Sequence, residues 1–192
     1  MHNRLKAKML RKSSFNIDKA ISAIKLILLD METHTAGFHK LFKILYFAEK
    51  KHLALYGRSI LGDRYVAMQA GPVPSNTYDL LKVLRGDSLF SIDVDLSKDF
   101  EVSNNHYVHL LEPKYDYDIF SESEIECLKF SIAENKNLTF GILKEKSHDE
   151  AWKSADKEDT ISIFEIAKAG GANEELLKYI STRMENRRLD LK

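Results

Sequence analysis

The sequence predicts an α+β fold that is mainly helical: a compact single domain with one small, wing-like β-hairpin sheet. Three observations predict it. Apolar residues recur at helical spacing over much of the chain, and two β-like runs flank a turn near its middle. The chain has 192 residues, of which 44% are hydrophobic, so it is long enough to bury a real core without disulfides or metals.

The first two predicted helices carry most of the apolar residues. Asn16 is a good N-cap, and the apolar spacing from Ile17 to Met31 predicts a helix behind it. The segment GFHKLFKILYFAEKKHLALYG, residues 37–57, holds too many apolar residues for a single stripe. We therefore expect a buried central helix that ends at Gly57.

A stiff turn is predicted within GDRYVAMQAGPVPSNTYDLL, residues 62–81. Residues 64–68 form the expected strand. Pro72 and Pro74 fix their own φ angles and push the preceding residues toward extended geometry. Ser75 is expected to cap a helix over about 76–85. The turn is thus predicted to set the angle between strand and helix, and a larger residue at Gly71 would strain the backbone if Gly71 uses a positive φ.

The middle of the chain predicts a hairpin. FEVSNNHYVHLL, residues 100–111, sets two β-like runs around Asn104 and Asn105, which tolerate the positive φ angles of a tight turn. The nearby acids are expected to line a solvated strand edge: Asp93, Asp95, Asp99 and Glu101.

Helices are predicted again from Ser121 onward, over about 121–132, 139–146 and 173–188. Two capping boxes are expected at helix starts, formed by Ser121 with Glu124 and by Ser147 with Glu150. Trp152 is expected to fold back onto the core as an aromatic plug.

The charge is divided along the chain. Residues 1–86 contain 15 Lys+Arg against 6 Asp+Glu, whereas residues 87–192 contain 14 against 23, so a net charge of zero conceals opposite halves. Such a division indicates either two faces for different partners or two halves that attract each other within one fold. Residues 1–14 are predicted to be a basic, flexible arm, with Arg4, Lys6, Lys8, Arg11 and Lys12.

No pattern in the sequence predicts catalysis, a cofactor or a metal. The seven histidines lack zinc-site spacing, and the single cysteine, Cys127, excludes an internal disulfide and is expected to be a core residue. No serine other than Ser75 lies in the turn, and its better use there is the cap. The longest apolar runs are too short to cross a bilayer, so we expect a non-enzymatic cytoplasmic protein without membrane insertion.

Two kinds of partner remain. Helices followed by a hairpin suggest a winged-helix regulator that binds DNA, but an acidic hairpin and only Lys82 and Arg85 on the preceding helix make DNA an unfavourable partner. For a protein partner, the candidate contacts are Arg58, Arg64, Tyr65 and Tyr78. The alternative for Arg64 is an ion pair with Asp63 or Asp79 inside the domain.

Three segments resemble a known family, the Panacea domain of SocA-like antitoxins and phage-associated GepA-like proteins. HKLFKILYFAEKKHLALYG is similar to the family's central helix, GDRYVAMQAGPVPSNTYDLLK to its core motif, and SHDEAW to its late His/Trp segment. The resemblance assigns residues 15–155 to the Panacea domain and leaves residues 156–192 as a C-terminal helical extension packed on that domain.

The resemblance implies an antitoxin of a toxin–antitoxin system, which neutralises a cognate protein toxin by direct binding, either alone or as an adaptor that delivers the toxin to a cellular protease. It supplies no catalytic residues, and it implies that Gly71, Pro72, Pro74, Ser75 and Trp152 are scaffold residues. Some members carry a separate helix-turn-helix domain before this one, and we expect none within the roughly fifteen residues before the first helix.

Overall fold

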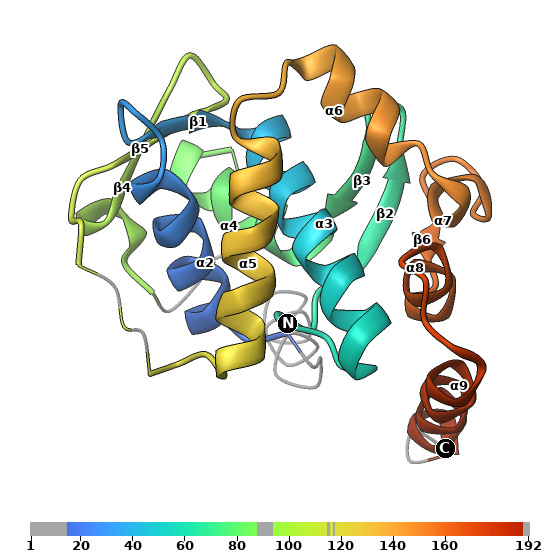
Figure 1. Ribbon diagram of the computed structural model, residues 1–192. Coiled ribbons are helices and arrows are strands. Elements are labelled where there is room, and N and C mark those ends of the chain that lie inside the picture. Colours follow the sequence, from blue (N-terminus) through green and yellow to red (C-terminus); the bar gives the residue numbers. More distant parts are fainter. Residues whose placement is uncertain (1–14, 88–93, 115, 117, 190–192) are drawn as a thin grey trace, which may run out of the picture.

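The computed structural model describes residues 15–87, 94–114, 116 and 118–189 (Figure 1). The predicted fold class is confirmed: within these residues the chain is mainly helical, with eight α-helices and two small three-stranded antiparallel sheets. The predicted arm over residues 1–14 and the acid Asp93 lie outside the described residues.

The central helix is α3 (Phe38–Tyr56), as the apolar sequence predicted. It packs against α2 (Ile17–Leu29), α5 (Glu122–Asn135), α6 (Phe140–Ser147) and α8 (Ile163–Ala169), and Figure 1 shows it passing through the middle of the molecule. Asn16 caps α2 by accepting from the Lys19 amide at 3.0 Å, and Gly57 ends α3 with a φ of 63°, so both predicted helix ends are confirmed.

The first sheet contains the predicted hairpin. Strands β4 (Phe100–Ser103) and β5 (Tyr107–Leu110) pair antiparallel, with Asn104 and Asn105 at φ angles of 46° and 62°. The sequence missed the third strand, β1 (Thr35–Gly37), which pairs with β5 and gives the order β1-β5-β4. A three-residue strand is too short for an alternation pattern, so only its pairing identifies it. The short 3-10 helix Leu96–Lys98 leads into β4.

The second sheet corrects the prediction of a simple turn. Strand β2 (Tyr65–Met68) is followed by a second strand, β3 (Gly71–Pro74), and the two form a hairpin whose register pairs Met68 with Gly71. Pro72 and Pro74 fit because β3 is an edge strand in the order β3-β2-β6, where missing amide donors disrupt no further ladder. Strand β6 (Thr160–Ile161) covers the other side of β2.

The helix after this hairpin, α4 (Ser75–Arg85), does not use Ser75 as its cap, and that prediction is wrong. Ser75 is the first helical residue, and no side chain in the N-cap position accepts a bond. Instead the buried Asp63 carboxylate accepts from the amides of Asn76 and Thr77 at 2.9 Å and from the Thr77 hydroxyl at 2.7 Å. The cap therefore comes from twelve or more residues upstream, which local sequence spacing does not reveal.

Of the two predicted capping boxes, one is confirmed and one is wrong. Ser121 and Glu124 form the reciprocal box at the start of α5. Ser147 is instead the buried last residue of α6, and the cap of α7 (Glu150–Lys153) is Asp149, which accepts from the Trp152 amide at 3.1 Å.

Two hydrophobic clusters meet on α3. One joins α3 to α2, α4, α5 and the first sheet; the other joins Tyr46, Phe47 and Leu53 to the second sheet and to residues 161–184. Helices α8 and α9 (Glu174–Leu189) belong to this second cluster, so the C-terminal segment packs on the central helix. No helix in the described part of the chain is long and apolar enough to span a membrane.

Candidate functional site

The three motif segments meet at one place, which we call the motif corner. It is formed by one face of α3, the start of β3, and the junction between α6 and α7; its residues are His39, Lys43, Tyr46, Lys50, Gly71, Pro72, Ser147, His148, Asp149 and Trp152. The α3 residues follow the spacing 39, 43, 46, 50, which places all four side chains on the same side of the helix.

Lys43 is the most unusual residue of the motif corner because its ammonium group is fully buried. Its Nζ donates to the Pro72 carbonyl at 2.8 Å, and burial lowers the pKa of Lys43 to about 7. Gly71 has a φ of 96°, and a Cβ atom there would collide with Ser147 Oγ and lie 3.0 Å from Lys43 Cε. The site thus requires glycine for its backbone and for its space.

His39 lies one helical turn before Lys43 and contacts the same hairpin. Its Nε2 is 3.2 Å from the Ala70 carbonyl, and its ring packs on Phe140 with 4.0 Å between centroids. Burial, reinforced by the charge of Lys43, lowers the pKa of His39 to about 4, so the imidazole is neutral at pH 7 and its Nε2–H donates to Ala70.

Asp149 ties the central helix to the junction between α6 and α7. Its two carboxylate oxygens accept from the Tyr46 hydroxyl at 2.9 Å, and Oδ2 accepts from Lys50 Nζ at 2.8 Å. The same carboxylate caps α7. Burial and the Asp149 charge raise the pKa of Tyr46 well above its ordinary value, so the phenol stays protonated and donates.

Trp152 connects this junction to the second sheet, and its predicted packing onto the core is what the structure has. Its indole Nε1 donates to the Met68 carbonyl at 3.0 Å, and its ring stacks on His148 with centroids 3.8 Å apart and planes 3° from parallel. Burial, followed by the charges of Lys144 and Lys43, lowers the pKa of His148, which favours the neutral ring in this stack.

Most polar groups of the motif corner therefore bind within the fold, although the buried Nε2 of His148 has no hydrogen-bond partner among the described residues. Lys43 and Asp149 could do acid–base work, but both are bound within the fold. Lys43 donates to the Pro72 carbonyl, and Asp149 accepts from the Tyr46 hydroxyl and the Trp152 amide. Ser147 donates to the Lys144 carbonyl at 3.0 Å. Among the residues that the structure describes, no three His, Cys, Asp or Glu side chains are grouped to hold a metal ion.

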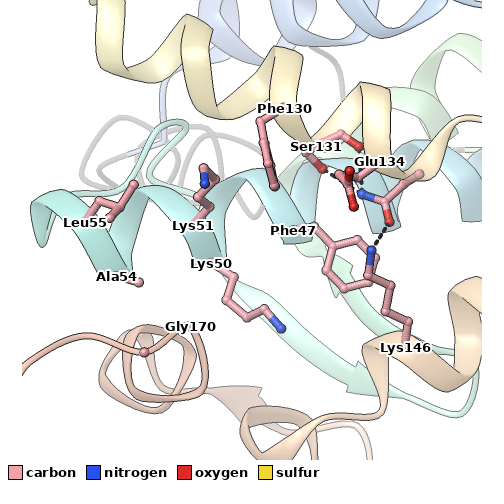
Figure 2. A pocket seen from close by; sticks show the side chains of 12 residues that line it. Phe47, Lys50, Lys51, Ala54, Leu55, Phe130, Ser131, Glu134, Lys146 and Gly170 are labelled. Carbon is pink, nitrogen blue, oxygen red and sulfur yellow. Dashed lines mark hydrogen bonds between the residues drawn. The ribbon is translucent and has the colours of Figure 1, made fainter.

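A second feature is a groove along the outer side of α3, which we call the α3 groove (Figure 2). It has a volume of about 260 Å³ and lies between α3, α5 and the end of α8. The apolar residues of its lining are Phe47, Ala54, Leu55 and Phe130. Its charged lining residues are three lysines and one glutamate: Lys50, Lys51, Lys146 and Glu134. Figure 2 shows Phe130 on α5 extending toward Lys51 on α3.

The comparison with protein families bears on the motif corner directly. A model described as antitoxin SocA-like, Panacea domain, matches residues 41–153, which include most of the motif corner and more than half of the chain. This chain belongs to that family. Membership supports a role of antitoxin type, and the resemblance drawn from the three sequence segments is confirmed. No curated protein and no solved structure matches the chain.

In this Panacea domain, the four residues predicted as partner contacts have different surroundings. Arg58 and Arg64 are exposed, and the Arg64 guanidinium forms no ion pair with Asp63 or Asp79. The Asp63 carboxylate instead accepts from the Arg64 backbone amide at 2.7 Å and binds the start of α4, and Asp79 binds Lys82 at 2.5 Å. Contact of Arg58 and Arg64 with a protein partner stays a prediction. Tyr78 is half-buried against Phe38 and Phe42.

The prediction that Tyr65 contacts a partner is wrong, because Tyr65 is 1% exposed and offers no surface to a partner. Its ring packs edge-on against Tyr46 at 5.5 Å, inside the second cluster. The alternation within residues 65–68 could have indicated this, since Tyr65 and Ala67 share the inward face of β2.

No local pattern in the sequence predicts the α3 groove. Its lining comes from three separate stretches, residues 47–55, 130–146 and 170–171, which only the tertiary fold brings together. One signal was present: the apolar residues of α3 exceed a single stripe, so some had to lie outside the main core or face a second partner.

Proposed function

We propose that this Panacea domain is an antitoxin that acts in the cytoplasm by binding a cognate protein toxin directly, with no chemistry of its own. The observation that carries the proposal is the family match over residues 41–153. The motif corner supports it, because its buried Lys43 and its partly buried Asp149 and Trp152 are bound within the fold and are better suited to hold a rigid scaffold than to act on a substrate.

Inhibition would follow from occlusion. A rigid surface that covers the substrate site of the toxin needs at least ~1,000 Å² of total buried area to be specific. In the alternative mode, the bound toxin is delivered to a cellular protease. The two modes differ in the lifetime of the toxin, which occlusion leaves unchanged or lengthens and delivery shortens.

DNA binding is the second candidate, and one observation favours it. The elements α2, β1, α3, α4, β4 and β5 follow one another in the order of a winged helix, with β1 beside β5, although the β2–β3 hairpin is inserted between α3 and α4. The charges oppose it: Lys82 binds Asp79, and Arg85 binds Asp87 at 2.6 Å and the Asn105 carbonyl at 2.7 Å. Few cations on α4 are left for phosphates.

The test is to express the adjacent gene alone and together with this one. Growth arrest by the neighbour alone, rescue by co-expression and co-purification of the two proteins are expected. The half-life of the toxin after synthesis is blocked then separates occlusion from delivery. A toxic neighbour with neither rescue nor complex would refute the pairing, and sequence-specific duplex binding by this chain, with a steep loss in salt, would favour the regulator instead.

A further inference from the structure

The α3 groove exposes apolar side chains that the fold does not use. Leu55 is 55% exposed and Phe130 is 50% exposed, and they line the groove together with Phe47 and Ala54. Single exposed apolar residues are normal on protein surfaces, but these come from two helices and line one hollow with the neighbouring lysines. Such an arrangement is typical of a surface that buries a partner's side chain.

The three lysines around the groove differ in whether a carboxylate binds them. Lys50 is bound to Asp149 at 2.8 Å. Lys51 instead holds its ammonium 3.8 Å from the centre of the Phe130 ring, and Lys146 donates to the amide oxygen of Asn135 at 2.7 Å. Within the described ranges neither Lys51 nor Lys146 has a carboxylate partner, so the groove presents two ammonium groups beside an apolar surface, with Glu134 as the acid of the lining.

We propose that the α3 groove binds a segment of a protein partner in which an apolar side chain is flanked by carboxylates. The inference rests on the proposed function, so the partner is the toxin. The apolar side chain packs on Phe130 and Leu55, and the flanking carboxylates pair with Lys51 and Lys146.

Size and charge favour this occupant over others. A volume of about 260 Å³ lies below the ~300–1,000 Å³ of most small-molecule sites but accommodates a side chain of a larger partner. A nucleic acid backbone would gain only two ammonium groups that lack a carboxylate partner among the described residues, and it would meet the Glu134 carboxylate, whereas a protein segment can also bury the apolar surface.

The groove is too small to be the whole interface, so we assign it the role of anchor. Binding energy concentrates in a few buried aromatic and charged residues, while the surrounding contacts exclude water. Lys51 and Lys146 would also attract an acidic partner from a distance, which makes the association rate fall as salt is added.

The experiment measures the affinity of the purified chain for the product of the adjacent gene by surface plasmon resonance. Phe130→Ala and Lys51→Glu remove the apolar and the charged part of the anchor. The matched controls are Leu111→Ala and Lys98→Glu, whose side chains are 52% and 83% exposed outside the groove. Each groove variant should raise Kd at least tenfold and each control less than twofold, and circular dichroism melts verify that all four variants are folded.

A charge swap then identifies the partner chemistry. One Asp→Lys or Glu→Lys substitution in the toxin should restore binding to Lys51→Glu, and failure of every such substitution would overturn the carboxylate assignment. Unchanged affinity of both groove variants, with wild-type binding and growth rescue intact, overturns the groove while leaving the antitoxin role standing.

Two further outcomes are decisive. If the wild-type chain neither binds the neighbour nor rescues growth, the proposed function and this inference both fail for that partner. If duplex DNA displaces the toxin from the wild-type chain, and Lys51→Glu abolishes the DNA binding, the groove binds a nucleic acid and the protein occupant is refuted.

Discussion

Replacement of Gly71 is the most direct test of how the motif corner is built. The residue has a φ of 96°, and a Cβ atom would collide with Ser147 Oγ and press on the buried end of Lys43. The left-handed backbone costs an alanine about 1–2 kcal/mol. If the Lys43 ammonium is displaced from the Pro72 carbonyl, an unsatisfied buried donor adds about 1–3 kcal/mol. We therefore expect Gly71→Ala to lower the free energy of unfolding by about 3 kcal/mol.

Gly86→Ala is the matched control, because Gly86 has a φ of 85° but nothing within 4 Å of the position of a Cβ. It should suffer the backbone cost alone, about 1–2 kcal/mol. Urea denaturation followed by circular dichroism gives both values, and the Gly71 variant should also melt about 6–12 °C below wild type for a chain of this size. Equal destabilisation of the two variants would refute the argument that Lys43 and Ser147 crowd this glycine, and a Gly71 variant as stable as wild type would refute the strain argument too.

Four further predictions concern other parts of the fold. Asp63→Ala should destabilise the protein by at least about 2 kcal/mol, measured by urea denaturation, because it leaves the buried Thr77 amide and hydroxyl without their acceptor. Burial raises the pKa of Glu49 to about 7, above its ordinary 4.5, so its stabilising contribution is complete below pH 4.5 and is lost as pH rises to about 7. Glu49→Gln, which keeps a neutral group of the same shape, should lack this part of the pH dependence when unfolding free energies are compared from pH 4.5 to 8. Cys127 is 1% exposed and its pKa is raised to about 11, so Ellman's reagent should modify it only at the rate of unfolding. Elemental analysis of untagged protein should find no stoichiometric zinc, iron or manganese; metal bound by two or more histidines would contradict this.

The sequence predicted those parts of the fold whose cause is local. The caps Asn16 and Ser121 and the helix end at Gly57 each depend on bonds within a few residues, and all three are as predicted. The hairpin around Asn104 and Asn105 depends on turn residues that tolerate positive φ, and it was predicted for the same reason.

The errors share a different cause, which is competition from residues distant in the chain. Asp63 caps α4 in place of Ser75, because its carboxylate accepts from the first amides of α4 although it precedes the β2–β3 hairpin in the chain. Ser147 could not open a helix because it packs against Gly71, where β3 begins. Spacing within six residues cannot distinguish a serine that caps from one that a distant strand surrounds.

The motif corner and the α3 groove lie on neighbouring faces of α3 and share Lys50. Residues 39, 43 and 46 of α3 bind the hairpin and Asp149, so changing them should cost stability before it changes any partner. Among the residues that the structure describes, Leu55, Lys51 and Phe130 show no comparable bonds, and the Lys51 ammonium lies 3.8 Å from the centre of a ring that is itself half exposed. The rim of the groove can therefore change its side chains while the scaffold beneath it is unaltered. Exposed side chains without internal bonds can differ between proteins that share this scaffold, and the division follows here from which face of α3 carries the internal hydrogen bonds.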